Sequence, residues 1–310
     1  NIIFLLVLNM GTQGYLLAYI LSNFLVALYA VIVGKGYKSF NFSGFDKNMF
    51  NGMIKYSIVL IPNTFMWWIM NSSDRVMVSY FIGTAANGIY AVSYKLPTLV
   101  STFTGIFNQA WGYSAIREEG KSDEIEYNNK IFRTLTATAT LMGLGMLLTI
   151  KPFLRFYVSP SYYQAWKYTP FLIVGCVFLT LATFMSTSYT VHKDSFGYLF
   201  SGMFGAFLNI ILNYFLIPHI GVYGAALATC LSYISVFFFR LFHTQKYMRY
   251  NILYKKFAIG VVLLLLSSIF IFVDNIIGLI LQTIIFLIGL FMYNEIWNPI
   301  VRKFIFRNKK

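Results

Sequence analysis

Charged and amide side chains interrupt the long hydrophobic stretch between Asn63 and Trp111. An adjacent acid and base, Asp74 and Arg75, lie inside its first apolar run, and Lys95 lies in the second. An ion inside hydrocarbon costs from about 3 to more than about 10 kcal/mol, so such groups face a protein interior or a water-filled cavity. Side chains of these types can therefore contact a polar solute within the membrane.

Two membrane helices joined by a tight turn are the elements that must position these groups. Small residues at 83–88, Gly-Thr-Ala-Ala-Asn-Gly, form the predicted turn, and the hairpin around it covers residues 53–114. Because polar side chains avoid lipid, we expect them on the helix faces that turn away from it.

The composition indicates a membrane protein. Of the 310 residues, 58% are hydrophobic and only 11% are charged, whereas a soluble domain carries roughly 25% charged residues. The mean hydropathy is +0.66, and the apolar residues come in runs of about 20, the length that spans a bilayer as a helix. We therefore predict an all-α polytopic membrane protein with about nine full transmembrane helices and a partial one.

The partial helix is the run at residues 1–10, where the chain opens without a recognisable signal peptide. A turn is expected at residues 11–14, and a loop of interfacial character at 151–167, where Pro152 and Pro160 interrupt the pattern. The full helices are expected at 15–33, 53–82, 89–114, 131–150, 169–191, 197–217, 222–242, 257–273 and 276–293.

The basic residues predict the orientation of these helices. The net charge is +14, but the bases lie mainly in loops and at the C-terminus, a distribution that argues against a nucleic-acid partner. If the segment 34–52 is cytoplasmic, the loops at 115–130, 192–196 and 243–256 and the C-terminal tail are cytoplasmic too. The opposite set, at 83–88, 151–167, 218–221 and 274–275, then carries only three bases, as the positive-inside rule expects.

The cysteines and histidines are not expected to take part in catalysis or metal binding. Cys176 and Cys230 lie in apolar runs, where cysteine behaves as a small hydrophobic residue. The three histidines are scattered and have no ligand at metal spacing. The sequence also lacks a nucleotide-binding glycine loop and a catalytic triad, so we predict no cofactor and no enzyme activity.

Two segments align with each other without gaps, GTQGYLLAYILSNFLVA from Gly11 and GVYGAALATCLSYISVF from Gly221. The identical positions include Gly11 with Gly221, Gly14 with Gly224 and Ala18 with Ala228. They fall on one helix face, where small residues allow close packing. Both segments run from outside to inside in the predicted topology, so the repeat is parallel, as in many transporters.

The segment IPNTFMWWIMNSSDRVMVSYFIGTAANGIYAVSYKLPTLV, at 61–100, resembles polysaccharide flippases of the multidrug/oligosaccharidyl-lipid/polysaccharide exporter superfamily. Its Asp-Arg, Phe-Ile-Gly, Gly-Ile-Tyr-Ala and Tyr-Lys-Leu-Pro pieces look like the family pattern at the seventh and eighth helices. The resemblance extends over nearly the whole chain. It implies two six-helix lobes around a central cavity, which alternately opens to each side of the bacterial cytoplasmic membrane.

The resemblance also implies a domain map. Residues 1–33 are the end of the first lobe, 34–52 a cytoplasmic linker, 53–243 the second six-helix lobe, and 244–310 two extra helices with a basic loop and tail. The first lobe is then mostly missing from this chain.

The implied substrate is a polyprenyl-diphosphate-linked oligosaccharide, and the implied pathway is O-antigen, capsule or other lipopolysaccharide-type biosynthesis. Partners expected beside the lipid bilayer are glycosyltransferases and a polysaccharide polymerase. A pyrophosphate requires cations, and sugars require hydrogen-bonding groups. The cationic candidates are Arg75, Lys95, Lys55 and Arg133. The polar candidates are Asp74, Asn63, Asn71, Asn108 and Gln109.

Other interpretations stay open at this point. Arg75 can pair with Asp74, and the other cations can extend to the membrane interface. A cation-coupled multidrug antiporter of the same superfamily would use Asp74 as its coupling site. A membrane glycosyltransferase or polymerase would want acidic residues on a large outer loop, where this chain has only Asp274. A non-transporting membrane scaffold would not need polar groups inside its helices.

Overall fold

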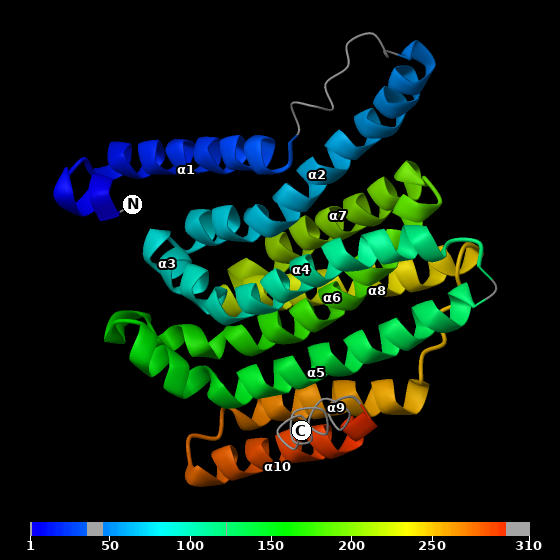
Figure 1. The fold of residues 1–310 in the computed structure, drawn as a ribbon. Coiled ribbons are helices and arrows are strands. Elements are labelled where there is room, and N and C mark those ends of the chain that lie inside the picture. The colour runs from blue at the N-terminus through cyan, green and yellow to red at the C-terminus, as the bar shows by residue number, and fades with distance from the viewer. Residues whose placement is uncertain (1, 36–45, 122, 296–310) are drawn as a thin grey trace, which may run out of the picture. The chain divides into compact units, whose positions relative to one another are not determined.

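The computed structural model describes residues 2–35, 46–121 and 123–295, and its regular elements are helices throughout (Figure 1). It divides into two compact units, Asn1–Lys55 and Tyr56–Lys310. The first unit holds the short π-helix η1 (Ile3–Val7), the helix α1 (Gly11–Val33) and the start of α2 (Lys47–Phe81). The prediction of an all-helical fold is confirmed for the described residues.

The second unit contains the rest of α2 and the helices that follow it. They are α3 (Thr84–Ser93), α4 (Lys95–Glu118), α5 (Glu124–Tyr157), η4 (Pro160–Lys167), α6 (Thr169–Val191), α7 (Ser195–Ile220), α8 (Val222–His243), η5 (Thr244–Lys246), α9 (Tyr254–Phe270) and α10 (Ile276–Met292).

Helix α6 forms the centre of this unit. It packs against α4, α5 and α8, and most of its side chains are buried. Helix α7 packs against α8, while α9 and α10 pair with each other and cover α5 (Figure 1). The main apolar core lies around aromatic residues such as Trp111, Phe132 and Phe184.

Five of the described helices are long and apolar enough to cross a membrane, judged by length and composition. They are α1, α5, α6, α7 and α8 with its extension to Lys246. Helices α9 and α10 have only 17 residues each, and the longer helices α2 and α4 are not among the five. The number of nine spans and the assignment to lobes stay predictions, and residues 36–45 of the predicted linker and the tail from residue 296 lie outside the described residues.

The two prolines of the predicted interfacial loop act differently. Pro152 lies inside α5, which continues to Tyr157, so the loop predicted from residue 151 is wrong over its first part. Neighbouring helices tolerate the missing hydrogen bond of a proline inside a membrane helix. Pro160 opens the 3₁₀ helix η4, where its missing amide is unneeded.

The predicted helix after residue 88 is interrupted at Tyr94, between α3 and α4. Pro97 lies in the first turn of α4. A proline ring excludes the carbonyl group four residues earlier, here that of Ser93, and Ser93 is the last residue of α3. The predicted turn at 83–88 is also shorter than expected, because α3 already begins at Thr84.

The matched glycines of the repeat have the same local structure in both copies. Gly11 and Gly221 have φ angles of +53° and +62°, in the region that favours glycine, and a helix begins at each of these turns. The turn predicted for residues 11–14 is wrong, because α1 already begins at Gly11 and the break between the helices lies at residues 8–10. A Cβ atom added at Gly14 or Gly224 would lie within 3 Å of backbone atoms of the preceding segment, so the sequence repeat has a structural counterpart within each unit.

Replacing Gly224 with alanine should destabilise the protein. A Cβ atom there would lie 2.5 Å from both the carbon and the oxygen of the Leu216 carbonyl, which is helix backbone and cannot rotate away. We expect a loss of roughly 1–3 kcal/mol in the free energy of unfolding, as for other overpacked sites. Thermal unfolding in detergent measures the effect.

The matched control is Gly105→Ala in α4, where nothing lies within 4 Å of the added Cβ atom. Alanine is favoured over glycine in a helix by roughly 0.5–1 kcal/mol, so this variant should be neutral or more stable. Equal unfolding temperatures for the two variants would contradict the close contact at Gly224.

Candidate functional site

A fully buried carboxylate, Asp74 on α2, is the centre of the polar groups inside the second unit. Its Oδ2 atom accepts hydrogen bonds from the hydroxyls of Tyr90 and Tyr94, each at 2.7 Å, and from Thr229 at 3.4 Å. The backbone amide of Arg75 donates to Oδ1 at 2.8 Å. Because an ionised carboxylate only accepts hydrogen bonds, these donors match it without a cationic side chain.

A chain of amides and hydroxyls continues from this carboxylate across α7 and α8. The Ser73 hydroxyl donates to Asn209 at 2.8 Å, and the Asn209 amide donates to Thr229 at 3.4 Å. The Tyr233 hydroxyl donates to Asn71 at 3.0 Å. These contacts, together with the apolar contacts of Met70, hold α2 to α7 and α8. We refer to the residues that share these bonds as the Asp74 network, namely Asn71, Ser73, Asp74, Tyr90, Tyr94, Asn209, Thr229 and Tyr233.

Arg75 does not form an ion pair with Asp74 through its side chain, so the alternative interpretation in which the two residues pair is not observed. Its guanidinium lies over the ring of Tyr94, 5.2 Å from the centroid, and the residue is exposed. Together with Ser79, Tyr80 and Asn87 it lines an open cavity of about 440 Å³. Tyr94 therefore has two contacts: its hydroxyl donates to the buried acid, and its ring positions the exposed guanidinium of Arg75.

Most of the other predicted site residues lie apart from this network. Lys95 and Gln109 are exposed on α4, and no contact joins either of them to Asp74 among the described residues. Arg133 lies on α5, where its Nε contacts the Asn251 carbonyl at 3.4 Å. Lys55 belongs to the first unit, whose placement relative to the second is not described.

Two predicted asparagines have buried amide atoms without a hydrogen-bond partner among the described residues. These atoms are Oδ1 of Asn63 and both amide atoms of Asn108. Asn63 faces Gly202 on α7, where a Cβ atom would lie 2.6 Å from its Oδ1. A buried polar atom that stays unpaired costs free energy, so both positions can take a hydrogen bond from a ligand or from water.

Arg240, near the end of α8, is a buried cation within the predicted helix at 222–242, and it was not among the predicted site residues. Its Nε donates to the Ser201 hydroxyl at 3.1 Å and Nη1 donates to the Ala182 carbonyl at 2.8 Å. Its guanidinium also lies 5.2 Å from the ring centroids of both Trp67 and Tyr198. The Nη2 atom has no hydrogen-bond partner in the described part of the chain. An arginine inside the aromatic run FFFRLF was the available signal.

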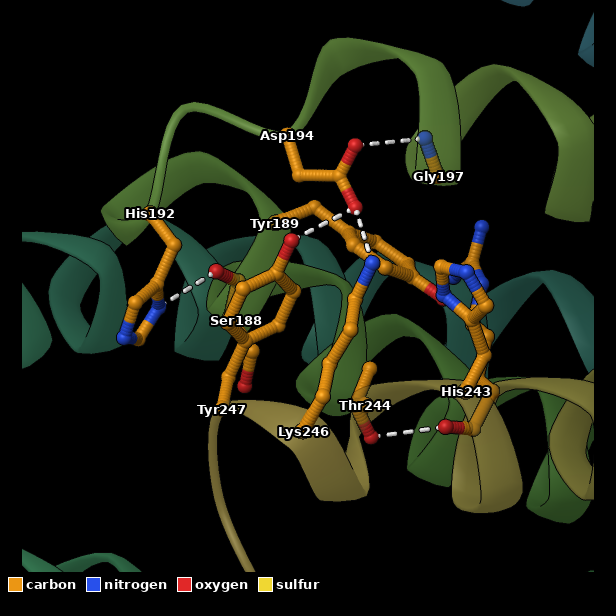
Figure 2. Close-up of polar contacts among 10 residues, drawn as sticks. Ser188, Tyr189, His192, Asp194, Gly197, His243, Thr244, Lys246 and Tyr247 are labelled. Atoms are coloured by element: carbon orange, nitrogen blue, oxygen red, sulfur yellow. Dashed lines mark hydrogen bonds and ion pairs between the residues drawn. The ribbon is translucent and has the colours of Figure 1, made fainter.

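A second polar cluster joins the ends of α6, α7 and α8 (Figure 2). Asp194 precedes α7 and accepts from the Gly197 amide at 2.8 Å, as an N-cap residue does. Its other oxygen accepts from the Tyr247 hydroxyl at 2.8 Å and from Lys246 at 3.0 Å. Burial alone would raise the pKa of Asp194, but these hydrogen bonds outweigh it and lower the pKa below its usual value.

The aromatic residues around Asp194 complete this cluster. The His192 ring stacks on Tyr247 with centroids 4.4 Å apart, and the Tyr189 hydroxyl lies 3.0 Å from Nδ1 of His243 (Figure 2). Both histidines thus have structural partners. Among the described residues no group of acids, cysteines and histidines could hold a metal ion, and the two cysteines are buried and free.

Comparison with protein families gives a match over residues 2–167, to the family described as polysaccharide biosynthesis protein. Two curated relatives are uncharacterized membrane proteins of Methanocaldococcus jannaschii. One is 24% identical over 78% of this chain and 60% of its own length. The other is 23% identical over 73% of this chain and 45% of its own length. The chain therefore spans about half the length of these relatives.

Among solved structures, the chain is similar to an outward-facing multidrug resistance MATE family transporter of the MOP superfamily. The TM-score is 0.52 at 19% sequence identity, over 71% of this chain and 52% of that chain. At this identity the likeness concerns the fold alone. It agrees with the helical membrane architecture predicted from the sequence.

Proposed function

Because the chain belongs to the polysaccharide biosynthesis protein family, we propose that it forms part of a transporter that flips polyprenyl-diphosphate-linked oligosaccharides across a membrane. Such a substrate has an anionic, hydrated head and an apolar tail. The head must pass through a polar, cationic interior, while the tail can stay in lipid. Alternating access of that interior to the two sides of the membrane would complete the transfer.

The observation that carries this proposal is the exposed guanidinium of Arg75 beside the buried Asp74 network. The Tyr94 ring and the backbone of α2 hold this cation within an otherwise apolar segment. Arginine binds phosphate oxygens through two nitrogens in a fixed plane. In the proposed mechanism Arg75 binds the pyrophosphate, and the buried network keeps its helix in place during the change of access.

Further contacts to the substrate are part of the same proposal. Lys95 is exposed at the start of α4 and would add a point charge for phosphate. The amides of Asn63, Asn71, Asn108 and Gln109 would bond sugar hydroxyls. We propose the bacterial cytoplasmic membrane as the location, with the C-terminus in the cytoplasm, and the enzymes of glycan assembly and polymerisation as partners. The protein itself would carry out no covalent chemistry.

A cation-coupled antiporter is the second candidate function, and one observation favours it. Asp74 is buried and bonded by hydroxyls, with no ion pair to a side chain of the described residues. A carboxylate in such a place can bind a proton or a metal cation that is moved in exchange for another solute. The two candidates differ in the substrate that they carry.

Arg75→Ala in the complete protein should reduce export of the lipid-linked oligosaccharide, and Arg75→Lys should reduce it less. Loss of a charge-assisted hydrogen bond costs about 1.5–3 kcal/mol, which corresponds to a change of about ten-fold or more in affinity. Transfer of a labelled lipid-linked oligosaccharide across proteoliposome membranes measures the rate.

The matched control is Arg117→Ala, which removes an exposed arginine from the last turn of α4. This variant should transport at the original rate. Normal transfer by the Arg75→Ala variant at equal protein level would assign Arg75 a structural role only. Transfer of a drug cation but not of the oligosaccharide by the unaltered protein would favour the antiporter.

A further inference from the structure

A cavity of about 850 Å³ lies between α5 and α9, away from the Asp74 network. Its walls come from the N-terminal parts of α5 and α9 and from the residues after α10. These three helices pack side by side in the second unit (Figure 1). The cavity thus lies at one end of these adjacent helices, where charged residues give way to apolar ones.

The charged side chains around this cavity are of both signs in equal number. Lys130, Arg133 and Lys256 face Asp123, Glu126 and Glu295, so the formal charges sum to zero. Lys256 and Glu295 form an ion pair at 2.8 Å. The side chains of the other four form no ion pair within the described part of the chain, and Arg133 contributes only its Nε to a protein contact, at 3.4 Å. Two cations and two acids are thus available to a ligand.

The walls of the cavity are held in place by hydrogen bonds. The side chain of Asn129 is buried and bonds the loop before α9 twice, accepting from the Asn251 amide at 2.6 Å and donating to the Arg249 carbonyl at 3.3 Å. The Tyr293 hydroxyl donates to the Lys256 carbonyl at 3.3 Å. These bonds fix α5, the loop and α10 around the cavity without closing it.

The uncharged lining contains polar residues such as Asn129 and Thr136, and an apolar part that includes Phe132, Ile252, Leu253 and Phe257. The apolar part of this surface would not stabilise a bound water-soluble zwitterion. It would stabilise a bound lipid by contact with the glycerol backbone and the upper acyl chain. Basic pockets between membrane helices commonly bind lipid head groups. This cavity differs from them because acids accompany its bases.

We propose that this cavity binds a phospholipid whose headgroup carries both a phosphate and a primary ammonium, as phosphatidylethanolamine does. Arg133 and Lys130 would hold the phosphate, since guanidinium and ammonium groups donate to its oxygens. Glu126 and Asp123 would accept hydrogen bonds from the ammonium. A phosphatidylglycerol headgroup lacks the ammonium, and a phosphatidylcholine headgroup carries a nitrogen without N–H donors. Binding here does not depend on the proposed transport function.

Lipid binding to the purified full chain tests the proposal. The protein is delipidated in detergent and titrated with phosphatidylethanolamine, phosphatidylglycerol or phosphatidylcholine of identical acyl chains, and bound lipid is counted by native mass spectrometry. We expect phosphatidylethanolamine to bind most tightly. The double variant Lys130→Gln, Arg133→Gln should weaken it by about ten-fold or more, the effect of losing a charge-assisted hydrogen bond.

Two further variants separate the contributions of the headgroup. Glu126→Gln should reduce the preference for phosphatidylethanolamine over phosphatidylglycerol, because it removes the negative charge that attracts the ammonium and leaves a weaker, neutral acceptor. Arg117→Gln changes an exposed arginine that does not line the cavity and should leave binding unchanged. Circular dichroism confirms that each variant is folded.

Other results would overturn the proposal. Equal binding of the three lipids would mean that the headgroup is not recognised. Tighter binding of phosphatidylglycerol would indicate simple attraction of anions by the basic surface. If lipid binds only after residues 296–310 are deleted, the ligand of the cavity in the full chain is that segment and not a lipid.

Discussion

Replacing Asp74 with alanine should lower the free energy of unfolding by about 3 kcal/mol or more. The substitution leaves the hydroxyls of Tyr90 and Tyr94 without their common acceptor in a buried place. Each buried donor that loses its partner costs about 1–3 kcal/mol. Because the same carboxylate also bonds Thr229 on α8, contact between α2 and α8 should weaken as well. Thermal unfolding of the purified protein in detergent measures the loss.

Asp74→Asn should fall between the alanine variant and the original protein, because the amide keeps one oxygen that can accept both tyrosine hydroxyls. The control is Glu119→Ala, which removes an exposed acid at the end of α4. If Asp74 serves the structure alone, the transport rates of the original protein, the Asp74→Asn variant and the Asp74→Ala variant should decrease in the same order as their stabilities. A stable Asp74→Asn variant without transport would instead mean that the charge itself takes part, as the antiporter interpretation requires.

Arg240→Ala should lower the free energy of unfolding by a similar amount. It removes a buried side chain that lies against two aromatic rings, together with the hydrogen bonds that it donates to the Ala182 carbonyl and the Ser201 hydroxyl. Truncation of a large buried side chain typically costs about 2–5 kcal/mol, and the lost hydrogen bonds add to this. The expected result is a large decrease in unfolding temperature or no folded protein.

Arg240→Met separates volume from charge at this position. An apolar side chain of similar length refills the space, and replacing a buried ion by a hydrophobic residue is often neutral for stability. We therefore expect the methionine variant to be more stable than the alanine variant. If the two unfold at the same temperature, the packing between Trp67 and Tyr198 contributes little. If the alanine variant unfolds like the original protein, the buried contacts of Arg240 are not stabilising.

The positions of most helices could be predicted from the sequence, because a helix in a membrane is formed by a local run of apolar residues. The predicted helix at 169–191 has the bounds of α6, and the predicted helices at 222–242 and 276–293 differ from α8 and α10 by a single residue at one end. Family membership was predictable for a similar reason, since its signature lies within residues 61–100. Prolines were less predictable, because the same residue ends a helix or stays inside one according to its neighbours.

The partners of the polar side chains could not be predicted in this way. Asp74 and Arg75 are adjacent in sequence, yet the acid is bonded by Tyr90, Tyr94 and Thr229, and the base lies over a ring. Successive residues of a helix point in directions about 100° apart, so neighbours in sequence seldom face the same environment. Thr229 follows Asp74 by 155 positions, a separation that no local pattern reports.

The sequence by itself determined the class of this protein, its helices and the family to which it belongs, because hydrophobic runs, loop charges and short motifs are local properties. Only the tertiary structure decided where each polar group lies. It buried Arg240 within the bundle, assigned Arg133 to a separate cavity beside α9, and left Arg75 exposed next to a buried acid. The reason is physical: burial and pairing depend on which helices pack together, and packing is set by contacts between residues far apart in the chain.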